Sequence, residues 1–391
     1  MHNFRYFELV KQRRLLKVMT NYSSPVLPPA TIGIIGGGQL GQMMALSAKS
    51  MGYKVGVLDP TDKAPAGQVA DFQVVADYDD LEALTELANQ SDVITYEFEN
   101  VDQVALKKVK NLTRIPQGIE LLTITSHRLR EKTFCRHHGL PVTPFASVKT
   151  MEDLEAAVKK IGQPGLLKTV EGGYDGHGQF DIDDQTDWTM IENEINQTEW
   201  IYELKQNFVR ELSIMVTRDG RGRVIAFPVS ENRHQHHILH TSIIPAQTSD
   251  EVKRKAQSIA SHTAEALDLR GVLGIELFEL ASGELMINEL APRPHNSGHY
   301  SIEACNISQF DAHIRSICGL SIPPIRQFEP AVMVNLLGDN LLVARADWPS
   351  HPEWHLHDYG KAEVRDSRKM GHITVTGPSI ESLLASVSQF R

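Results

Sequence analysis

Short apolar runs alternate with amphipathic segments from residue 31 to about residue 125. The runs TIGIIG, KVGVLD, FQVVA and DVITYEFE have the length and composition of strands, and DDLEALTELANQ carries apolar residues at helical intervals. Strands that alternate with helices in this way are typical of a parallel sheet with helices on its faces. We therefore predict an α/β fold that begins with a Rossmann-like domain over residues 31–125, after an extension and linker over residues 1–30.

The pattern changes after residue 126. A helix over SHRLREKTFCRHHG is followed by GLLKTV, EWIYEL, RELSIMVTR, GVLGIELFEL and ELMINELAP, which have the composition of strands. Successive strands of this kind, with few helices between them, favour an antiparallel α+β domain, which we place at residues 126–323. Beyond Pro323 and Pro324 the strands become short, so we predict a small β-rich module over residues 324–391.

Composition and charge narrow the class of protein. The 391 residues are 41% hydrophobic and 23% charged, as in ordinary soluble globular proteins, and the formal net charge is −10. Because nucleic acids are held by clustered Lys and Arg, we expect no nucleic-acid partner. No apolar run reaches the ~18 residues that a bilayer span requires, so we expect no membrane partner. Three widely spaced cysteines fit neither a disulfide framework nor a zinc site, and they favour the cytoplasm.

The segment that precedes the first strand is basic and mixed. Residues 1–18 lack the apolar core and cleavage site of a signal peptide, and MTNYSSPVLPPA has the composition of a linker. We expect residues 1–18 to reflect a start codon upstream of Met19, or to be a disordered tail, rather than a targeting signal.

The stretch GGGQLG has the composition of a phosphate-binding turn. Gly36, Gly38 and Gly41 have the G-x-G-x-x-G spacing between a strand and a helix, where bare amides and the positive helix end favour an anion. Asp59, about 20 residues further on, ends the second strand as a ribose-binding acid does in NAD-binding domains. Such a turn indicates a phosphate but not the molecule attached to it, so NAD is an alternative at this point.

Two glutamates are predicted to face each other in a hairpin. A turn at Ser282-Gly283 would put Glu276 directly opposite Glu289 on one face, with their Cβ atoms about 5 Å apart, where like charges repel. Apolar residues flank both glutamates, so a bound cation would relieve the repulsion better than solvent would. Carboxylate oxygens suit Mg²⁺ shared with substrate phosphates. The alternatives are a different register or pairing with Lys and Arg.

Two further stretches have the composition of anion-binding segments. EGGYDGHGQ follows Lys168, and its glycines let backbone amides approach phosphates and let the loop close, although a plain flexible hairpin has the same composition. YGKAEVRDSRKMGH gathers Lys361, Arg365, Arg368 and Lys369 in an acidic chain. This second stretch is either another anion site or a solvated basic face.

Clustered polar side chains follow the second glutamate. NELAPRPHNSGHY brings Arg293, His295, Asn296 and Ser297 onto a loop stiffened by two prolines, as at many active sites. The histidines of HQHHILH, residues 234–240, resemble a metal-binding tract. Their alternation along a predicted strand would place them on both faces, so we do not expect a metal site there.

These stretches together resemble the ATP-grasp superfamily, and within it the family of N5-carboxyaminoimidazole ribonucleotide synthases, ATP-dependent enzymes of purine synthesis. GGGQLG, EGGYDGHGQ, NELAPRPHNSGH and EVRDSRKMGH match the motifs of that family in order and spacing, over residues 31–391. The resemblance implies a pre-ATP-grasp domain, an ATP-grasp domain and a small C-terminal domain. It also assigns the glycine turn to the phosphate of a ribonucleotide and implies no nicotinamide cofactor.

The resemblance assigns a role to each matched position. It implies that ATP is bound by Arg128, Lys168, Gly173, Gly176, Glu203, Glu211 and Asn288. It implies that Mg²⁺ is bound by Glu276 and Glu289. It implies that the ribonucleotide is bound by Gly38, Gln39, Leu40 and Ser297. It implies that the reacting groups are contacted by Tyr174, Asp175, Arg293, His295, Asn296, Lys361 and Arg368. His177 departs from the Arg or Lys often found there, and Ala291 stands where many ATP-grasp enzymes have an Asn.

The implied reaction is the carboxylation of aminoimidazole ribonucleotide with bicarbonate. Bicarbonate is a poor electrophile, so ATP first phosphorylates it to carboxyphosphate, and the amine then attacks this species or the CO₂ that it releases. The resemblance also implies a cytoplasmic homodimer. The alternatives are another ATP-grasp ligase, such as a formate-dependent transformylase, and an NAD-dependent dehydrogenase, which would leave the paired glutamates unexplained.

Overall fold

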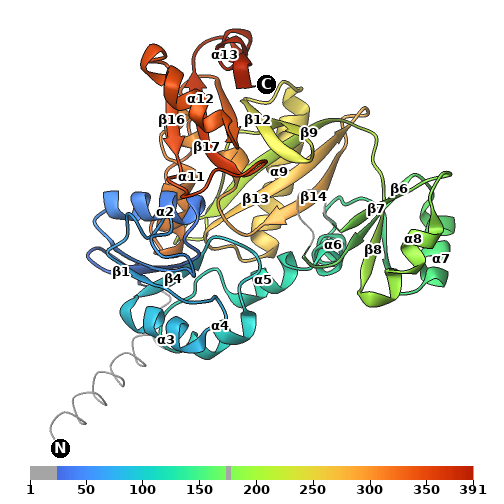
Figure 1. Cartoon of the computed structure of the whole chain (residues 1–391), viewed down its shortest axis with the longest axis horizontal. Helices are drawn as coiled ribbons and strands as arrows, with labels where there is room; N and C mark the ends of the chain where they lie inside the picture. Colours follow the sequence, from blue (N-terminus) through green and yellow to red (C-terminus); the bar gives the residue numbers. More distant parts are fainter. Residues whose placement is uncertain (1–23, 173–177, 391) are drawn as a thin grey trace, which may run out of the picture.

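The computed structural model describes residues 24–172 and 178–390. Figure 1 shows three sheets: the N-terminal sheet in blue, a small green sheet at the far side of the molecule, and a large sheet between them that runs on into the C-terminal segment in red. Among the described residues, no helix combines the length and the apolar character needed to cross a bilayer.

The N-terminal domain is built on a parallel sheet with the strand order β3-β2-β1-β4. Its elements are β1 (Thr31–Ile35), α2 (Gln39–Ser50), β2 (Lys54–Leu58), β3 (Phe72–Val74), α3 (Leu81–Gln90), β4 (Val93–Tyr96), α4 (Gln103–Val109) and α5 (Ile119–Thr125). Helices α3 and α4 cover one face, and α2 packs on the other together with Phe310 and Ile314 of a later helix. The parallel sheet confirms the predicted α/β class.

The small sheet is antiparallel, with the order β5-β8-β6-β7. Helix α6 (Arg128–His137) leads into it from the N-terminal domain. Its other elements are β5 (Phe145–Val148), α7 (Met151–Ile161), β6 (Gly165–Thr169), β7 (Gln179–Ile182), α8 (Trp188–Glu192), η1 (Ile195–Gln197) and β8 (Trp200–Leu204). Helix α7 begins at a capping box formed by Thr150 and Asp153 and packs on the sheet through Leu154 and Ala157.

The large sheet has the order β14-β13-β9-β11-β12-β15-β17-β16, with β10 paired to β9. Its central part contains β9 (Phe208–Arg218), β10 (Val224–Ala226), β11 (Ser230–Gln235), β12 (Ile238–Ile244), α9 (Asp250–Ala266), β13 (Val272–Leu280) and β14 (Leu285–Ala291). A loop with η2 (Asn296–Gly298) and α10 (Ser301–Ala304) then leads to α11 (Gln309–Ile317). Helix α9 buries Val252, Ala256 and Ala260 against one face of this sheet, and this packing supports β13 and β14.

The C-terminal strands extend the large sheet. They are β15 (Ala331–Leu337), β16 (His355–Asp358) and β17 (Lys369–Thr376), accompanied by α12 (Asn340–Asp347), η3 (Trp348–Ser350), α13 (Ile380–Ser386) and η4 (Ser388–Phe390). Strand β15 pairs antiparallel with β12, with Thr241 opposite Val334. The predicted C-terminal module therefore shares its sheet with the domain before it.

The prediction that the histidine tract runs along one strand is wrong. Residues 234 and 235 end β11, and His236 and His237 form the turn between β11 and β12. Both have positive φ, 49° and 65°, as the central residues of a type I′ hairpin turn require. The tract therefore does not run along one strand, since a turn reverses the chain within it.

Candidate active site

Glu276 and Glu289 are direct cross-strand partners in the β13–β14 hairpin, as predicted. The predicted turn differs by one residue, because Leu280 donates its N–H to the carbonyl of Glu284 at 2.9 Å around a three-residue loop. A β-bulge then places Asn288 as an extra residue between the pairs Leu277–Ile287 and Glu276–Glu289. The two displacements cancel, which restores the glutamate pair.

The surroundings of this pair fit a divalent cation. Burial raises the pKa of Glu276 to about 7, and the charge of Glu289 adds to the effect. The side-chain amide of Asn288 lies 3.4 Å from Glu276 Oε2, so a third oxygen is at hand if that amide turns. The described residues contain no group of three acidic, His or Cys side chains that could hold a metal. Two carboxylates fit Mg²⁺ that takes its remaining ligands from phosphates and water.

Three charged side chains lie beside the hairpin, and we call them the cationic wall. Lys168, on β6, lies 3.1 Å from Glu203 on β8, and the buried Lys132 of α6 lies 3.8 Å from the same carboxylate. Burial opposes the ionisation of Glu203, but Lys132 and Lys168 together lower its pKa to about 2. Glu203 is therefore ionised at neutral pH, and it holds the ammonium groups of Lys132 and Lys168 at this side of the site. Arg128, at the start of α6, lies 3.9 Å from Glu289, so it links the cationic wall to the Glu276–Glu289 pair.

Glu211 contacts a histidine that the sequence interpretation set aside. His234 on β11 hydrogen-bonds through Nδ1 to Glu211 on β9. Burial opposes protonation of His234, but Glu211 and Glu276 outweigh it and raise the pKa of the imidazole. His234 is therefore bonded to Glu211 and lies near enough to Glu276 for their charges to interact. No spacing in the sequence indicates this, because the contact depends on the pairing of β9 with β11.

The polar loop after β14 converges on the same place. His295 Nε2 lies 3.4 Å from Glu276 Oε1, and His295 Nδ1 lies 2.8 Å from the hydroxyl of Ser297. Burial, with the nearby charge of Arg293, holds the pKa of His295 well below its usual range, so the ring is neutral. The amide nitrogen of Asn296 is buried without a hydrogen-bond partner among the described residues. Arg293 is paired with Glu99 at 2.7 Å.

The prediction that the glycine turn presents bare amides is wrong, because the amides of Gly37, Gly38 and Gly41 bind carboxylates of the protein itself. The amides of Gly38 and Gly41 donate to the two oxygens of Glu97, at 2.5 and 2.6 Å. Asp59 accepts from the Gly37 amide at 2.7 Å and from the hydroxyl of Tyr78 at 2.7 Å. Asp59 is therefore engaged by the protein and is not presented as the ribose-binding acid of an NAD site. Sequence reasoning missed Glu97, since no motif marks it.

Gln39 and Leu40 form the first turn of α2, where N–H groups have no partner within the helix. Lys361 is close enough to Glu97 for their charges to interact: burial and Arg368 lower the pKa of Lys361 to about 8, while Glu97 opposes the shift. The preceding residue, Gly360, accepts a hydrogen bond from the side chain of Gln68 at 3.2 Å. Lys361 also donates to the carbonyl of Lys369 at 2.6 Å. Arg368 donates to the carbonyl of Glu363 at 3.2 Å. The C-terminal basic stretch thus reaches the N-terminal domain.

The glycine-rich loop after Lys168 is described only at its ends. Gly173, Tyr174, Asp175, Gly176 and His177 lie outside the described residues, so their predicted roles stay predictions.

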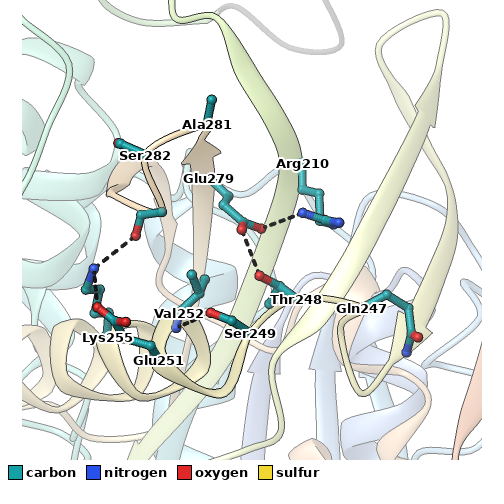
Figure 2. A pocket seen from close by; sticks show the side chains of 11 residues that line it. Arg210, Gln247, Thr248, Ser249, Glu251, Val252, Lys255, Glu279, Ala281 and Ser282 are labelled. Carbon is teal, nitrogen blue, oxygen red and sulfur yellow. Dashed lines mark hydrogen bonds and ion pairs between the residues drawn. The ribbon is translucent and has the colours of Figure 1, made fainter.

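A separate pocket of about 410 Å³ lies at the tip of the β13–β14 hairpin and the start of α9 (Figure 2). Glu279 projects into it and bonds to Arg210 at 3.4 Å and to Thr248 at 2.7 Å. None of the predicted site residues lines this pocket. Its charged side chains bond to one another, and the predicted chemistry lies further along the hairpin.

Comparisons with known proteins agree with this arrangement. Residues 29–125 match the ribonucleotide synthetase preATP-grasp domain, residues 133–310 the ATP-grasp domain, and residues 331–386 the phosphoribosylaminoimidazole carboxylase C-terminal domain. The chain is 47% identical over 349 residues to N5-carboxyaminoimidazole ribonucleotide synthase of Bacillus subtilis (strain 168), covering 89% of this chain and 92% of the relative.

Solved structures give the same result. A crystal structure of an ADP complex of N5-carboxyaminoimidazole ribonucleotide synthetase superposes with a TM-score of 0.90 at 45% identity, covering 94% of this chain and 97% of the other. The Aspergillus clavatus synthase in complex with ADP and 5-aminoimidazole ribonucleotide superposes with a TM-score of 0.86 at 32% identity, covering 92% and 97%. The chain therefore belongs to the N5-carboxyaminoimidazole ribonucleotide synthase family of ATP-grasp enzymes.

Proposed function

We propose that this chain uses ATP to carboxylate 5-aminoimidazole ribonucleotide with bicarbonate, giving N5-carboxyaminoimidazole ribonucleotide, ADP and phosphate in purine biosynthesis. The observation that carries the proposal is the position of the Glu276–Glu289 pair, which contacts the cationic wall through Arg128 and the polar loop through His295. A phosphoryl donor and an acceptor can therefore meet at one pair of carboxylates. The relatives solved with ADP and with 5-aminoimidazole ribonucleotide support this reading.

The cationic wall is the proposed nucleotide side of the site. Arg128 and Lys168 would neutralise the phosphates of ATP, and Glu203 would accept a hydrogen bond from the adenine amine. Glu211 would accept from the ribose hydroxyls, and we add His234 to this group because it bonds to Glu211. The proposed nucleotide residues Gly173, Gly176 and Asn288 would approach the phosphates.

Glu276 and Glu289 are the proposed ligands of Mg²⁺. When bound there, Mg²⁺ would neutralise charge on the phosphoryl group during its transfer. The raised pKa of Glu276 supports the assignment, because a cation would relieve the repulsion between the two carboxylates.

The polar loop and the glycine turn form the proposed acceptor side. Gly38, Gln39, Leu40 and Ser297 would bind the ribonucleotide. Lys361 and Arg368 would add positive charge near its phosphate. Tyr174, Asp175, Arg293, His295 and Asn296 would orient bicarbonate and the exocyclic amine. The unpaired amide of Asn296 supports this role, since a buried donor without a partner is available to an incoming oxygen.

The proposed chemistry has two steps. A bicarbonate oxygen attacks the γ-phosphorus, the bond to ADP breaks, and carboxyphosphate forms. The exocyclic nitrogen of the ribonucleotide then attacks the carboxyl carbon, or the CO₂ released from it, and phosphate leaves. A dry site favours this route, because carboxyphosphate hydrolyses in water. Closure of the glycine-rich loop would exclude water.

We also propose a cytoplasmic homodimer. The cysteines Cys135, Cys305 and Cys318 are free and buried, which suits a reducing compartment. The homodimer rests on the family resemblance, and sedimentation analysis tests it.

Phosphate release from ATP tests the function. We expect release with bicarbonate that increases when aminoimidazole ribonucleotide is present, and no such increase when formate replaces bicarbonate. A formate-dependent rate would indicate a transformylase instead.

A further inference from the structure

Helix α6 places two ionisable side chains in the interior, side by side. Burial raises the pKa of Glu131 to about 8, so its carboxyl group is mostly neutral at pH 7. Lys132 is 2% exposed and Glu131 is 3% exposed. Charged side chains are almost never this buried unless their charges and hydrogen-bonding atoms are satisfied. The face that carries them also includes Arg128 at its start and Cys135 one turn later, at helical spacing.

Lys132 donates hydrogen bonds to the backbone of β14 at its bulge. Its ammonium group donates to the carbonyl of Ile287 at 3.0 Å and to the carbonyl of Asn288 at 2.9 Å. A bulge disrupts the hydrogen-bond ladder, and β14 is the edge strand of the large sheet, so carbonyls there need other donors. Lys132 supplies them from one side chain.

Glu131 bonds to the same strand on the other side of Glu289. Its Oε2 accepts the N–H of Leu290 at 3.0 Å. Lys132 and Glu131 therefore hold the backbone both before and after Glu289. The peptide segment that carries the Glu289 carboxylate is therefore anchored at two points.

Lys132 also contacts the small sheet. Its ammonium lies 3.8 Å from Glu203, which lies 3.1 Å from Lys168. The small sheet supplies Glu203 and Lys168, and the large sheet supplies the bulge. One buried ammonium group therefore joins the two sheets between which the nucleotide is proposed to bind.

We infer that Lys132, assisted by Glu131, is a positioning residue that fixes the β14 bulge, and with it Glu289, against Glu203 and Lys168 of the small sheet. The inference rests on the proposed Mg²⁺ role of Glu276 and Glu289. Residues that orient metal ligands change metal affinity by roughly 10–100-fold when replaced, which sets the size of the effect.

Lys132→Met tests the inference, since it keeps the length of the side chain and removes its donors and charge. Cys135→Ala is the matched control: it opens a cavity on the same face of α6, in the apolar core that also contains Ile287, but it leaves the bonds from Lys132 to the bulge carbonyls in place. Hydrogen exchange is measured in the metal-free protein on peptides covering β14 and, separately, β13. Binding of ADP is then titrated by calorimetry over a range of Mg²⁺ concentrations.

We expect Lys132→Met to speed exchange in β14 more than in β13 and to raise the Mg²⁺ concentration needed for ADP binding about 10-fold or more. Cys135→Ala should lower the melting temperature and leave the Mg²⁺ requirement within about twofold, because a cavity alone does not move the bulge. If the Lys132 variant does not fold, Glu131→Leu, which removes only the acceptor for Leu290, carries the same expectations.

Unchanged exchange and an unchanged Mg²⁺ requirement in the variant would overturn the inference, as would equal changes in Cys135→Ala. Failure of the unmodified protein to bind ADP in a Mg²⁺-dependent manner would instead refute the proposed metal role. The two failures are therefore distinguishable.

Discussion

Glu276 and Glu289 face each other across β13 and β14 because an extra residue in the bulge at Asn288 compensates for an extra residue in the loop at Ala281–Gly283. Gly283 has φ of 76°, as the last residue of such a three-residue loop requires. A hairpin without the bulge would place Glu276 opposite Asn288. The bulge is therefore what makes two carboxylates available to one cation.

Replacing Glu276 or Glu289 with Gln should abolish activity and leave the fold intact. Each change removes a charged ligand, but it also relieves like-charge repulsion worth about 0.2–1 kcal/mol, so the melting temperature of the metal-free protein should hold or rise slightly. Melting with and without Mg-ATP measures both effects. A destabilised variant with normal turnover would show that the pair is structural, with each carboxylate held by its basic neighbour.

Replacing Gly38 with Val should weaken ribonucleotide binding more than ATP binding. A Cβ atom at Gly38 would lie 2.7 Å from Glu97 Oε1, so the carboxylate and the turn must move apart. Calorimetric titration of both ligands measures the difference, and Leu46→Gln, at an exposed position of the same helix, is the control. Equal loss for both ligands, or micromolar binding of NAD to the unmodified protein, would contradict the assignment of the turn.

A chain beginning at Met19 should keep full activity and its melting temperature. The described part of the linker, in contrast, packs on the body: Val26 donates its N–H to Cys318 at 2.8 Å and accepts from the hydroxyl of Tyr53 at 2.7 Å. Removing residues 1–30 should therefore lower the melting temperature, which differential scanning calorimetry would detect. A large loss on removing only residues 1–18 would show that those residues also stabilise the fold.

Acid should destabilise the protein partly through His313. Burial lowers the pKa of His313 to about 3, and its Nδ1 accepts the N–H of Val272 at 3.1 Å. The unfolded value is about 6.5, so the folded state favours the neutral ring: this contribution is complete above about pH 6.5 and is lost as the pH falls towards 3. His313→Gln should reduce the pH dependence by up to ~1.4 kcal/mol per pH unit in that range.

Urea unfolding at pH 7 and pH 5.5 measures this difference. The exposed His262 on α9 offers the control variant His262→Gln, which should keep the pH dependence of the unmodified protein. An identical slope for His313→Gln and the unmodified protein would contradict the contribution of His313.

Local sequence pattern predicted much of the fold and part of the site. The parallel N-terminal sheet and the Glu276–Glu289 pair follow from alternation and from short-range hairpin geometry. The continuity of the large sheet could not be predicted, because the pairing of Thr241 with Val334 joins segments far apart in the sequence. The histidine tract was predicted as one strand because positive φ is uncommon for residues other than glycine, and His236 and His237 both adopt it.

The site residues that the sequence did not predict were missed for one physical reason. Glu97 and Lys132 stand in no motif, and His234 stands in a tract that gave no reason to expect a site. Each of the three makes contacts that only the folded chain creates. Lys132 had a faint signal, since a charged residue on the apolar side of an amphipathic helix must be satisfied by something outside the helix. Its partner, a bulge on a distant strand, is not encoded locally.

Carboxylation is measured most directly by following carbon-13 bicarbonate with aminoimidazole ribonucleotide and Mg-ATP by NMR. We expect the label to appear as a carbamate on the exocyclic nitrogen, with one ADP formed per labelled product, and neither to form with Glu276→Gln or Glu289→Gln. Labelled product without ATP consumption, or ATP consumption that is equal with and without the ribonucleotide and yields no labelled product, would contradict the proposed function.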